Sequence, residues 1–301
     1  MSPKWKKIDY YVNFIYAGKK EGTVEFEYTF RFGNETILYT YSKGAGGILA
    51  SESLRVDDNL VFERKNGSFC IDKQQFPMEE TIENNLGSNA NNVSIVNFLL
   101  TSYPLSKEHY LIKLSKFVNS MLWFRNLDIR EFIGLETSVT NLDEFIIANG
   151  LLKEFSNFLQ SVSGQNFQLT VHSSTDKQIL CDIDGSEIPF NLVASTGTRS
   201  LQLLYFWMKR MSEASFVFID EFDAFYHFRL AFEVCKMLFN MDCQIFTSSH
   251  NTYLMTNDLL RPDCNFILNE NKIKPLCDCT DKELRFGHNI EKLFRGNTFK
   301  V

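Results

Sequence analysis

Two adjacent acidic residues follow an apolar run in the last third of the chain. Residues 214–225 read ASFVFIDEFDAF, and four apolar residues precede Asp220 and Glu221. Open α/β sheets bind ligands beyond the carboxyl ends of their strands, so both carboxylates are expected to face such a site. There, one acid can bind Mg²⁺ through the coordination shell of the ion, and the second can polarise a water molecule. The same residues also fit a plainer alternative, a strand that runs into an exposed acidic turn.

A small polar turn lies about 20 residues earlier, at the start of a predicted amphipathic helix. It consists of Ser195, Thr196, Gly197 and Thr198. A helix N-terminus presents free backbone N–H groups and the positive end of the helix dipole, and both favour phosphate oxygens. The turn is therefore a candidate phosphate contact. The alternative is an ordinary helix N-cap with a glycine beside it.

A histidine follows a second apolar strand further along the chain. Residues 243–250 read CQIFTSSH and end in His250. A histidine just past the end of a strand, beside another strand that ends in two acids, can donate a hydrogen bond to a phosphate group. Taken alone, His250 fits equally well a structural residue whose hydrogen bonds are satisfied.

The elements that must position these residues change in kind along the chain. Alternating apolar and polar residues in 21–72 predict an antiparallel meander of some four strands, with hairpin turns at Gly33-Asn34 and Asn66-Gly67. Apolar residues near the 3.6 period predict helices between 79 and about 160, including one over 110–127. Alternation then returns in two strands, of which the second leads into a turn at Asp184-Gly185.

After Pro189, helices and strands alternate. We expect helices at about 198–211 and 228–239 and strands at 216–219 and 243–247, an order that favours a parallel sheet with helices on its faces. Short strands are expected at 265–268 and 272–276. The predicted organisation is an antiparallel β region in 1–78, a helical insertion or arm in 79–165, and an α/β lobe in 166–301.

In order and spacing, the three motifs resemble those of ABC and SMC-like ATPases. STGTRSL resembles their signature, with Thr196 in place of the first Gly and Thr198 in place of Gln or Glu. FVFIDE resembles a Walker B motif, residues 222–227 fall where the D-loop lies, and SSH resembles the switch-histidine strand. The closer resemblance is to AAA-family proteins of the ABC superfamily found in bacterial anti-phage and abortive-infection operons. It covers nearly the whole chain and includes residues 289–296.

The resemblance implies an α/β fold, an ABC-type P-loop NTPase-like lobe with an N-terminal antiparallel β region and a helical insertion. It implies ATP and Mg²⁺ as cofactors, with Asp220 as the metal-shell acid, Glu221 as the catalytic base and His250 as a sensor of the γ-phosphate. The activity implied is ATP hydrolysis, coupled to conformational switching by dimer closure in prokaryotic defence or DNA transactions.

One motif of the family is missing. No G-x-x-x-x-G-K-S/T phosphate loop occurs in the sequence, and neither Gly18-Lys19-Lys20 nor the glycine-rich residues 42–47 replace it. Three explanations stay open: a truncated reading frame, a separate polypeptide that supplies the missing half, or a degenerate member that binds partners without hydrolysis. The isolated chain is accordingly expected to bind nucleotide poorly.

Composition limits the remaining possibilities. The net charge of −6 gives no global basic field for nonspecific nucleic-acid binding, and seven scattered cysteines favour reduced thiols. No apolar run suits a membrane span or signal peptide, so we expect a cytoplasmic protein without a membrane partner. Expected partners are a second copy or a complementing subunit, with a nucleic acid or an effector protein as further candidates. Two other functions stay open: a metal-dependent nuclease built on Asp220, Glu221 and Asp223, and a non-catalytic interaction subunit.

Overall fold

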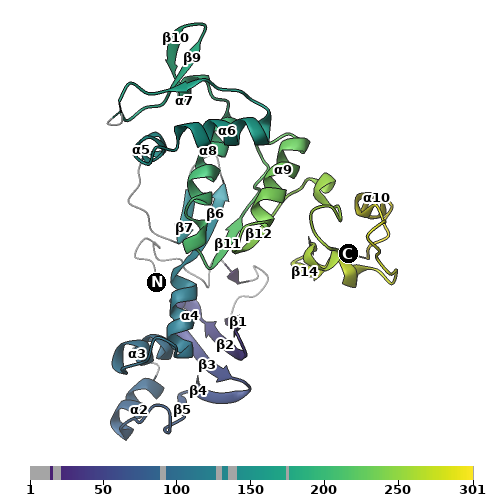
Figure 1. Cartoon of the computed structure of the whole chain (residues 1–301). Coiled ribbons are helices and arrows are strands. Elements are labelled where there is room, and N and C mark those ends of the chain that lie inside the picture. Colours follow the sequence, from purple (N-terminus) through teal and green to yellow (C-terminus); the bar gives the residue numbers. More distant parts are fainter. Residues whose placement is uncertain are drawn as a thin grey trace. The chain divides into compact units, whose positions relative to one another are not determined.

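The computed structural model describes residues 14–15, 22–88, 93–126, 131–134, 141–173 and 176–300. The tripeptide Gly18-Lys19-Lys20 lies outside them. The chain forms two compact units, Met1–Asn119 and Ser120–Val301. This division falls inside the predicted helical region 79–165, because the helices before it pack on the first sheet and the residues after it belong to the second (Figure 1).

The first unit is built on an antiparallel meander in which each strand pairs with the next. The predicted hairpin turns at Gly33-Asn34 and Asn66-Gly67 are confirmed. A third turn, Asp57-Asp58, has positive φ at both residues (48° and 65°), as a type I′ turn requires. This turn makes the meander one of five strands rather than four. The strands are β1 Val24–Phe32, β2 Glu35–Lys43, β3 Leu49–Val56, β4 Asn59–Lys65 and β5 Ser68–Ile71.

The helices described over residues 80–119 are α2 Glu80–Gly87, α3 Ile95–Ser102 and α4 Tyr110–Asn119. Their apolar faces bury Ile95, Leu99 and Leu111 against Leu54 and Phe62 of the sheet. The apolar faces predicted for these helices therefore cover one face of the β-sheet, which must be buried for the sheet to be stable.

The second unit contains a four-stranded sheet in the order β12-β11-β6-β7. Strand β11 (Phe216–Ile219) lies parallel to both β6 (Met121–Asn126) and β12 (Gln244–Thr247), and β7 (Glu131–Gly134) is antiparallel to β6. The prediction of one helix over 110–127 is wrong, because the helix ends at Asn119 and β6 follows.

Helices pack against this sheet (Figure 1). Buried residues of α8 and α9 share one core with Leu122, Phe124, Val217 and Ile219 of the sheet. The predicted strand 216–219 and the predicted helix 228–239 are confirmed at both ends. The helices are α5 Leu142–Ala148, α6 Leu152–Ser163, α7 Phe190–Val193, α8 Thr196–Met208 and α9 Phe228–Phe239.

Smaller elements complete the second unit. Strands β8 Leu169–Thr170, β9 Leu180–Ile183 and β10 Ser186–Pro189 form an antiparallel sheet, with the predicted turn at Asp184-Gly185. The C-terminal part contains the hairpin β13 Phe266–Asn269 and β14 Lys272–Pro275, and the helix α10 Ile290–Arg295. The 3-10 helices in the described residues are η1 Ala45–Gly47, η2 Met211–Glu213, η3 Thr252–Leu254, η4 Pro262–Cys264 and η5 Leu276–Cys279. In the described part of the chain, no helix is long and apolar enough to cross a bilayer.

Candidate functional site

The acidic pair lies at the carboxyl end of β11. Val217 and Ile219 of this strand are fully buried, which fixes the strand in the core. The backbone N–H of Asp220 donates to the carbonyl of Phe124 (2.9 Å), so the parallel pairing with β6 continues one residue past the strand. Asp220 is half-buried, whereas the side chain of Glu221 is 57% exposed. The two neighbouring carboxylates therefore have different environments.

Ser248 connects the end of β12 to both acids. Its hydroxyl donates to Oδ1 of Asp220 (2.5 Å) and accepts from the backbone N–H of Glu221 (2.8 Å). The backbone continues the same pairing, because the N–H of Ser248 donates to the carbonyl of Ile219 (3.0 Å). One hydroxyl thus holds the carboxylate of one acid and the backbone of the next.

His250 reaches the same edge of the sheet. Its Nε2 lies 3.7 Å from Oε1 of Glu221, and its side chain is 94% exposed. Ile219 and Thr247 are register partners in the parallel pair β11–β12, so the residues that follow each strand emerge side by side. Beside them, Ser249 donates to Oδ2 of Asp223 (2.8 Å). The structure therefore brings the predicted acids and the predicted histidine together.

The polar turn forms the first turn of α8. Ser195 is the N-cap, and its Oγ accepts from the backbone N–H of Thr198 (3.2 Å). The hydroxyl of Thr198 is buried and donates to Oε1 of Gln165 (3.0 Å). Thr196 accepts from the guanidinium of Arg199 (3.4 Å). Of the hydroxyls in this turn, that of Ser195 belongs to an exposed residue and is the best placed to meet a ligand.

Residues 222–227 pack against this turn. A Cβ atom added to Gly197 would lie only 2.9 Å from the carbonyl oxygen of Phe225. One turn further along α8, the hydroxyls of Ser200 and Tyr226 are 2.8 Å apart and buried. Burial also raises the pKa of Tyr226 above its ordinary value. The segment that follows the acidic pair is thus in direct contact with the Ser195 turn, and this contact requires glycine at position 197.

Sequence reasoning did not single out Ser248, Gln165 or Tyr226. Ser248 carried a local signal, since it is a hydroxyl residue directly after an apolar strand. Gln165 and Tyr226 carried none, because their partners, Thr198 and Ser200, lie 33 and 26 residues away in the chain.

The donor set at Asp220 fits Mg²⁺ bound together with phosphate. Among the residues that the structure describes, no group of three or more His, Cys, Asp or Glu side chains is arranged to hold a metal ion. Mg²⁺ commonly binds through one or two carboxylates plus substrate phosphates and water, rather than in an all-protein cage. Asp220, whose Oδ1 is already oriented by Ser248, suits that mode of binding.

The solved structures that are similar to the chain include three SMC head domains. A Thermotoga maritima SMC head domain matches 78% of this chain and 66% of its own, with 12% identity and a TM-score of 0.35. An SMC head bound to the C-terminal winged-helix domain of ScpA matches 77% of this chain and 68% of its own, with 12% identity and a TM-score of 0.37. A Pyrococcus furiosus SMC head with an extended coiled coil, bound to the C-terminal domain of ScpA, matches 73% and 67%, with 11% identity and a TM-score of 0.30. The chain thus spans about two thirds of the length of these head domains.

Comparison of sequences gives the family. No curated protein matches the chain. The family described as "AAA domain, putative AbiEii toxin, Type IV TA system" matches residues 17–256, more than half of the chain. This match confirms the resemblance to AAA-family proteins of abortive-infection systems. The chain belongs to this family of AAA-type ATPase domains.

Proposed function

We propose that this chain supplies one half of an ATP-hydrolysing site, and that the phosphate-binding loop is supplied by a polypeptide segment outside this sequence. The observation that carries the proposal is the convergence of Asp220, Glu221 and His250 at one sheet edge, where Ser248 links the ends of β11 and β12. Membership of a family of AAA domains supports ATP as the substrate.

Each residue has a distinct task in this proposal. Asp220 holds Mg²⁺, which when bound offsets the negative charge of the phosphates. Glu221 accepts a proton from a water molecule, for which its exposed carboxylate is accessible. His250, which is more exposed than the neighbouring Glu221, donates a hydrogen bond to a phosphate oxygen. Ser248 keeps the first two groups in place.

We propose that the turn from Ser195 to Thr198 contacts a second nucleotide, one that is bound to the other subunit of a dimer. In ABC-type dimers the signature of one subunit contacts the nucleotide held by the other, and the exposed Ser195 with its helix N-terminus offers that contact here. We therefore propose that the chain works in a dimer, with a complementing subunit or with a second copy completed by the missing loop. Closure and opening of this dimer would be the switch, in prokaryotic defence or in DNA transactions. The cytoplasmic location and the effector or nucleic-acid partner stay predictions.

The test is ATP hydrolysis by the chain purified, through an affinity tag, with its bound polypeptides from the cells that encode it. We expect hydrolysis that needs Mg²⁺ and that falls about 100-fold or more in the Glu221→Gln variant, since general-base catalysis typically contributes that much. The control is Glu213→Gln, an exposed acid of η2 that pairs with Arg210 instead. An inactive wild-type complex, or an unchanged rate in Glu221→Gln, would refute the proposal.

Two further measurements separate the alternatives. Calorimetry of the chain alone with MgATP should show no binding at micromolar strength, and such binding would show that a phosphate loop is not needed. Cleavage of nucleic acid that requires a metal but not ATP, and that is lost in Glu221→Gln, would favour the nuclease instead. A stable complex without any hydrolysis would favour the non-catalytic interaction subunit.

A further inference from the structure

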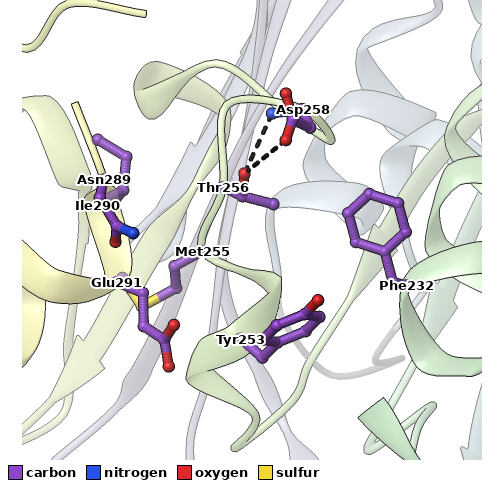
Figure 2. A pocket seen from close by; sticks show the side chains of 8 residues that line it. All are labelled: Phe232, Tyr253, Met255, Thr256, Asp258, Asn289, Ile290 and Glu291. Carbon is purple, nitrogen blue, oxygen red and sulfur yellow. Dashed lines mark hydrogen bonds between the residues drawn. The ribbon is translucent and has the colours of Figure 1, made fainter. Parts of the chain in front are cut away.

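A small pocket is enclosed by three parts of the second unit: helix α9, residues 253–258 (which begin in η3), and residues 289–291 at the start of α10. Its volume is about 170 Å³, and Figure 2 shows its side chains grouped around one space. None of Asp220, Glu221 and His250 lines it. The lining residues that matter for its chemistry are Phe232, Tyr253, Thr256, Asp258, Asn289 and Glu291.

Two aromatic rings line one side of the pocket. The rings of Phe232 and Tyr253 lie edge to face, with centroids 6.5 Å apart. Tyr253 is 49% exposed and also contacts the ring of Phe228, which is 67% exposed. The faces of such rings attract cations, and guanidinium groups stack on them particularly well. The aromatic surface continues from the pocket onto the exterior.

Two carboxylates line the pocket as well, and each has contacts at only one of its oxygens among the interactions of the described residues. Thr252 and Arg295 both contact Oε1 of Glu291, at 3.2 and 2.8 Å. The hydroxyl of Thr256 donates to Oδ2 of Asp258 at 3.4 Å and accepts from the backbone N–H of Asp258 at 3.3 Å, the two bonds dashed in Figure 2. Oε2 of Glu291 and Oδ1 of Asp258 are therefore the oxygens left to accept from a ligand. Among the described residues that line the pocket there is neither Lys nor Arg.

Size and charge together restrict the ligand. Sites for drug-sized ligands occupy about 300–1,000 Å³, whereas a cavity of about 150 Å³ holds a benzene-sized molecule. A nucleotide is too large for this pocket, and its phosphates would meet two carboxylates. A planar cation the size of one side chain fits, because it can stack on an aromatic ring while its N–H groups donate to carboxylate oxygens.

We propose that this pocket binds the guanidinium group of an arginine side chain presented by a partner polypeptide. A polypeptide, rather than a free small cation, is the source because the exposed ring of Phe228 extends the contact surface beyond the pocket itself. Tyr253 lies three residues after His250, so the occupied pocket would restrain the segment that carries the histidine.

The test uses the full chain and three blocked tripeptides, glycine-X-glycine, with X as arginine, lysine or citrulline. Binding is followed by the amide NMR signals of Tyr253, Thr256 and Glu291 during titration. We expect saturable binding of the arginine peptide. The citrulline peptide keeps the shape of the arginine side chain but lacks its charge. Its affinity should be lower by a factor of about ten or more, and tenfold corresponds to about 1.4 kcal/mol. The lysine peptide should also bind more weakly than the arginine peptide.

Variants of the pocket sharpen the test. Glu291→Gln and Asp258→Asn should each weaken binding of the arginine peptide about tenfold, whereas Glu283→Gln, which removes an exposed acid paired with Arg285 outside the pocket, should leave it unchanged. Equal binding of the arginine and citrulline peptides, or no binding of either, would overturn the proposal. This comparison uses the wild-type chain, so it holds even if a variant fails to fold. Free guanidinium binding as tightly as the arginine peptide would overturn the polypeptide source. No outcome depends on ATP hydrolysis, so the proposed function is tested separately.

Discussion

Glu221 has a backbone conformation that side-chain-bearing residues rarely adopt. Its φ is +42°, and a non-glycine residue in this region costs on the order of 1–2 kcal/mol. The N–H of Glu221 donates to Ser248 and the N–H of Phe222 donates to the carbonyl of the same serine. The end of β12 therefore stabilises a turn that would otherwise relax, and this turn directs two consecutive carboxylates to the sheet edge.

Replacement of Ser248 by alanine removes a donor to Asp220 and an acceptor for the N–H of Glu221. We expect a loss of about 1–2 kcal/mol in the free energy of unfolding, because both partners are left without this hydroxyl. Chemical denaturation measures the loss. Ser248→Thr, which keeps the hydroxyl, should recover part of it. Ser249→Ala, which removes the exposed contacts of this hydroxyl with Asp223 and with the backbone N–H of Asn251, should cost about 0.5 kcal/mol, because water can replace both. An equal loss in both serine variants would contradict the role given to Ser248.

Gly197 gives a second prediction at the residue scale. An alanine Cβ there would lie 2.9 Å from the carbonyl oxygen of Phe225, a backbone atom that cannot move without shifting the whole turn. Gly197→Ala should therefore destabilise the protein by about 1–3 kcal/mol, although alanine is normally the better helix former. Gly287→Ala is the matched control, since its Cβ would meet nothing within 4 Å. Thermal unfolding of the two variants compares them, and a stable Gly197→Ala protein would show that the close contact is absent.

Residue types were the most predictable part of the candidate site. Asp220, Glu221 and His250 were recognised because each follows an apolar run, and parallel pairing of those runs places their ends together. Thr198 was expected at the phosphate-facing turn, but its hydroxyl is buried and donates to Gln165. That contact spans 33 residues, and local sequence patterns contain no information on such long-range partners.

At the scale of the elements, the ends of a helix or strand were predictable where nearby residues determine them, and unpredictable where distant residues do. Strand β11 and helix α9 were predicted at both ends, because polar residues or capping groups bound their apolar patterns, as His227 does for α9. Strand β6 was missed inside a predicted helix. Short apolar runs do not distinguish a buried strand from a helix, and β6 is fixed by pairing with β11, whose residues are 95 positions further along the chain. The ring of its Phe124 packs on Trp207 of α8 (5.4 Å).

Helix α3 is held to the first sheet by one buried carboxylate. Glu52 of β3 accepts from the backbone N–H groups of Ile95 (2.7 Å) and Val96 (3.3 Å), and it also pairs with the buried Arg64 (3.4 Å). The carboxylate thus meets the positive end of the helix dipole as well as a cation. The first turn of α3 depends on a residue from a different element.

Glu52→Ala should destabilise the first unit by about 3–5 kcal/mol, because the substitution leaves the charge of Arg64 buried and unpaired. Hydrogen exchange should become faster at the amides of Ile95 and Val96. Glu63→Ala, at an exposed position of the neighbouring strand β4, is the control and should change stability by no more than about 0.5 kcal/mol. Unchanged exchange at the start of α3 in Glu52→Ala would contradict this anchoring role.

At the scale of the whole molecule, buried tyrosines link stability to alkaline pH in both units. Burial is the largest cause that raises the pKa of Tyr39 and Tyr110 in the first unit, and of Tyr205 and Tyr226 in the second. The ordinary value is 10.0. Above it the unfolded chain loses phenol protons while the folded chain keeps them, so the free energy of unfolding falls as pH rises.

We expect the free energy of unfolding, measured in urea, to decrease between about pH 9 and about pH 11. Tyr226→Phe should reduce the slope of this decrease by an amount that approaches about one proton near pH 11, because burial raises the pKa of Tyr226 above its ordinary value in the folded protein. Tyr28→Phe serves as the control, since Tyr28 is 40% exposed. The same slope in wild type and Tyr226→Phe would mean that this phenol ionises in the folded state.

The central claim is that Asp220, Glu221 and His250 are the hydrolytic half of a site completed by a phosphate loop from elsewhere. The most direct measurement is the fate of ATP bound to the purified complex that carries Glu221→Gln. With Mg²⁺ present, the account predicts that this complex retains intact ATP, because the nucleotide is held but the general base is lost. Conversion of the bound ATP to ADP at the wild-type rate would contradict it.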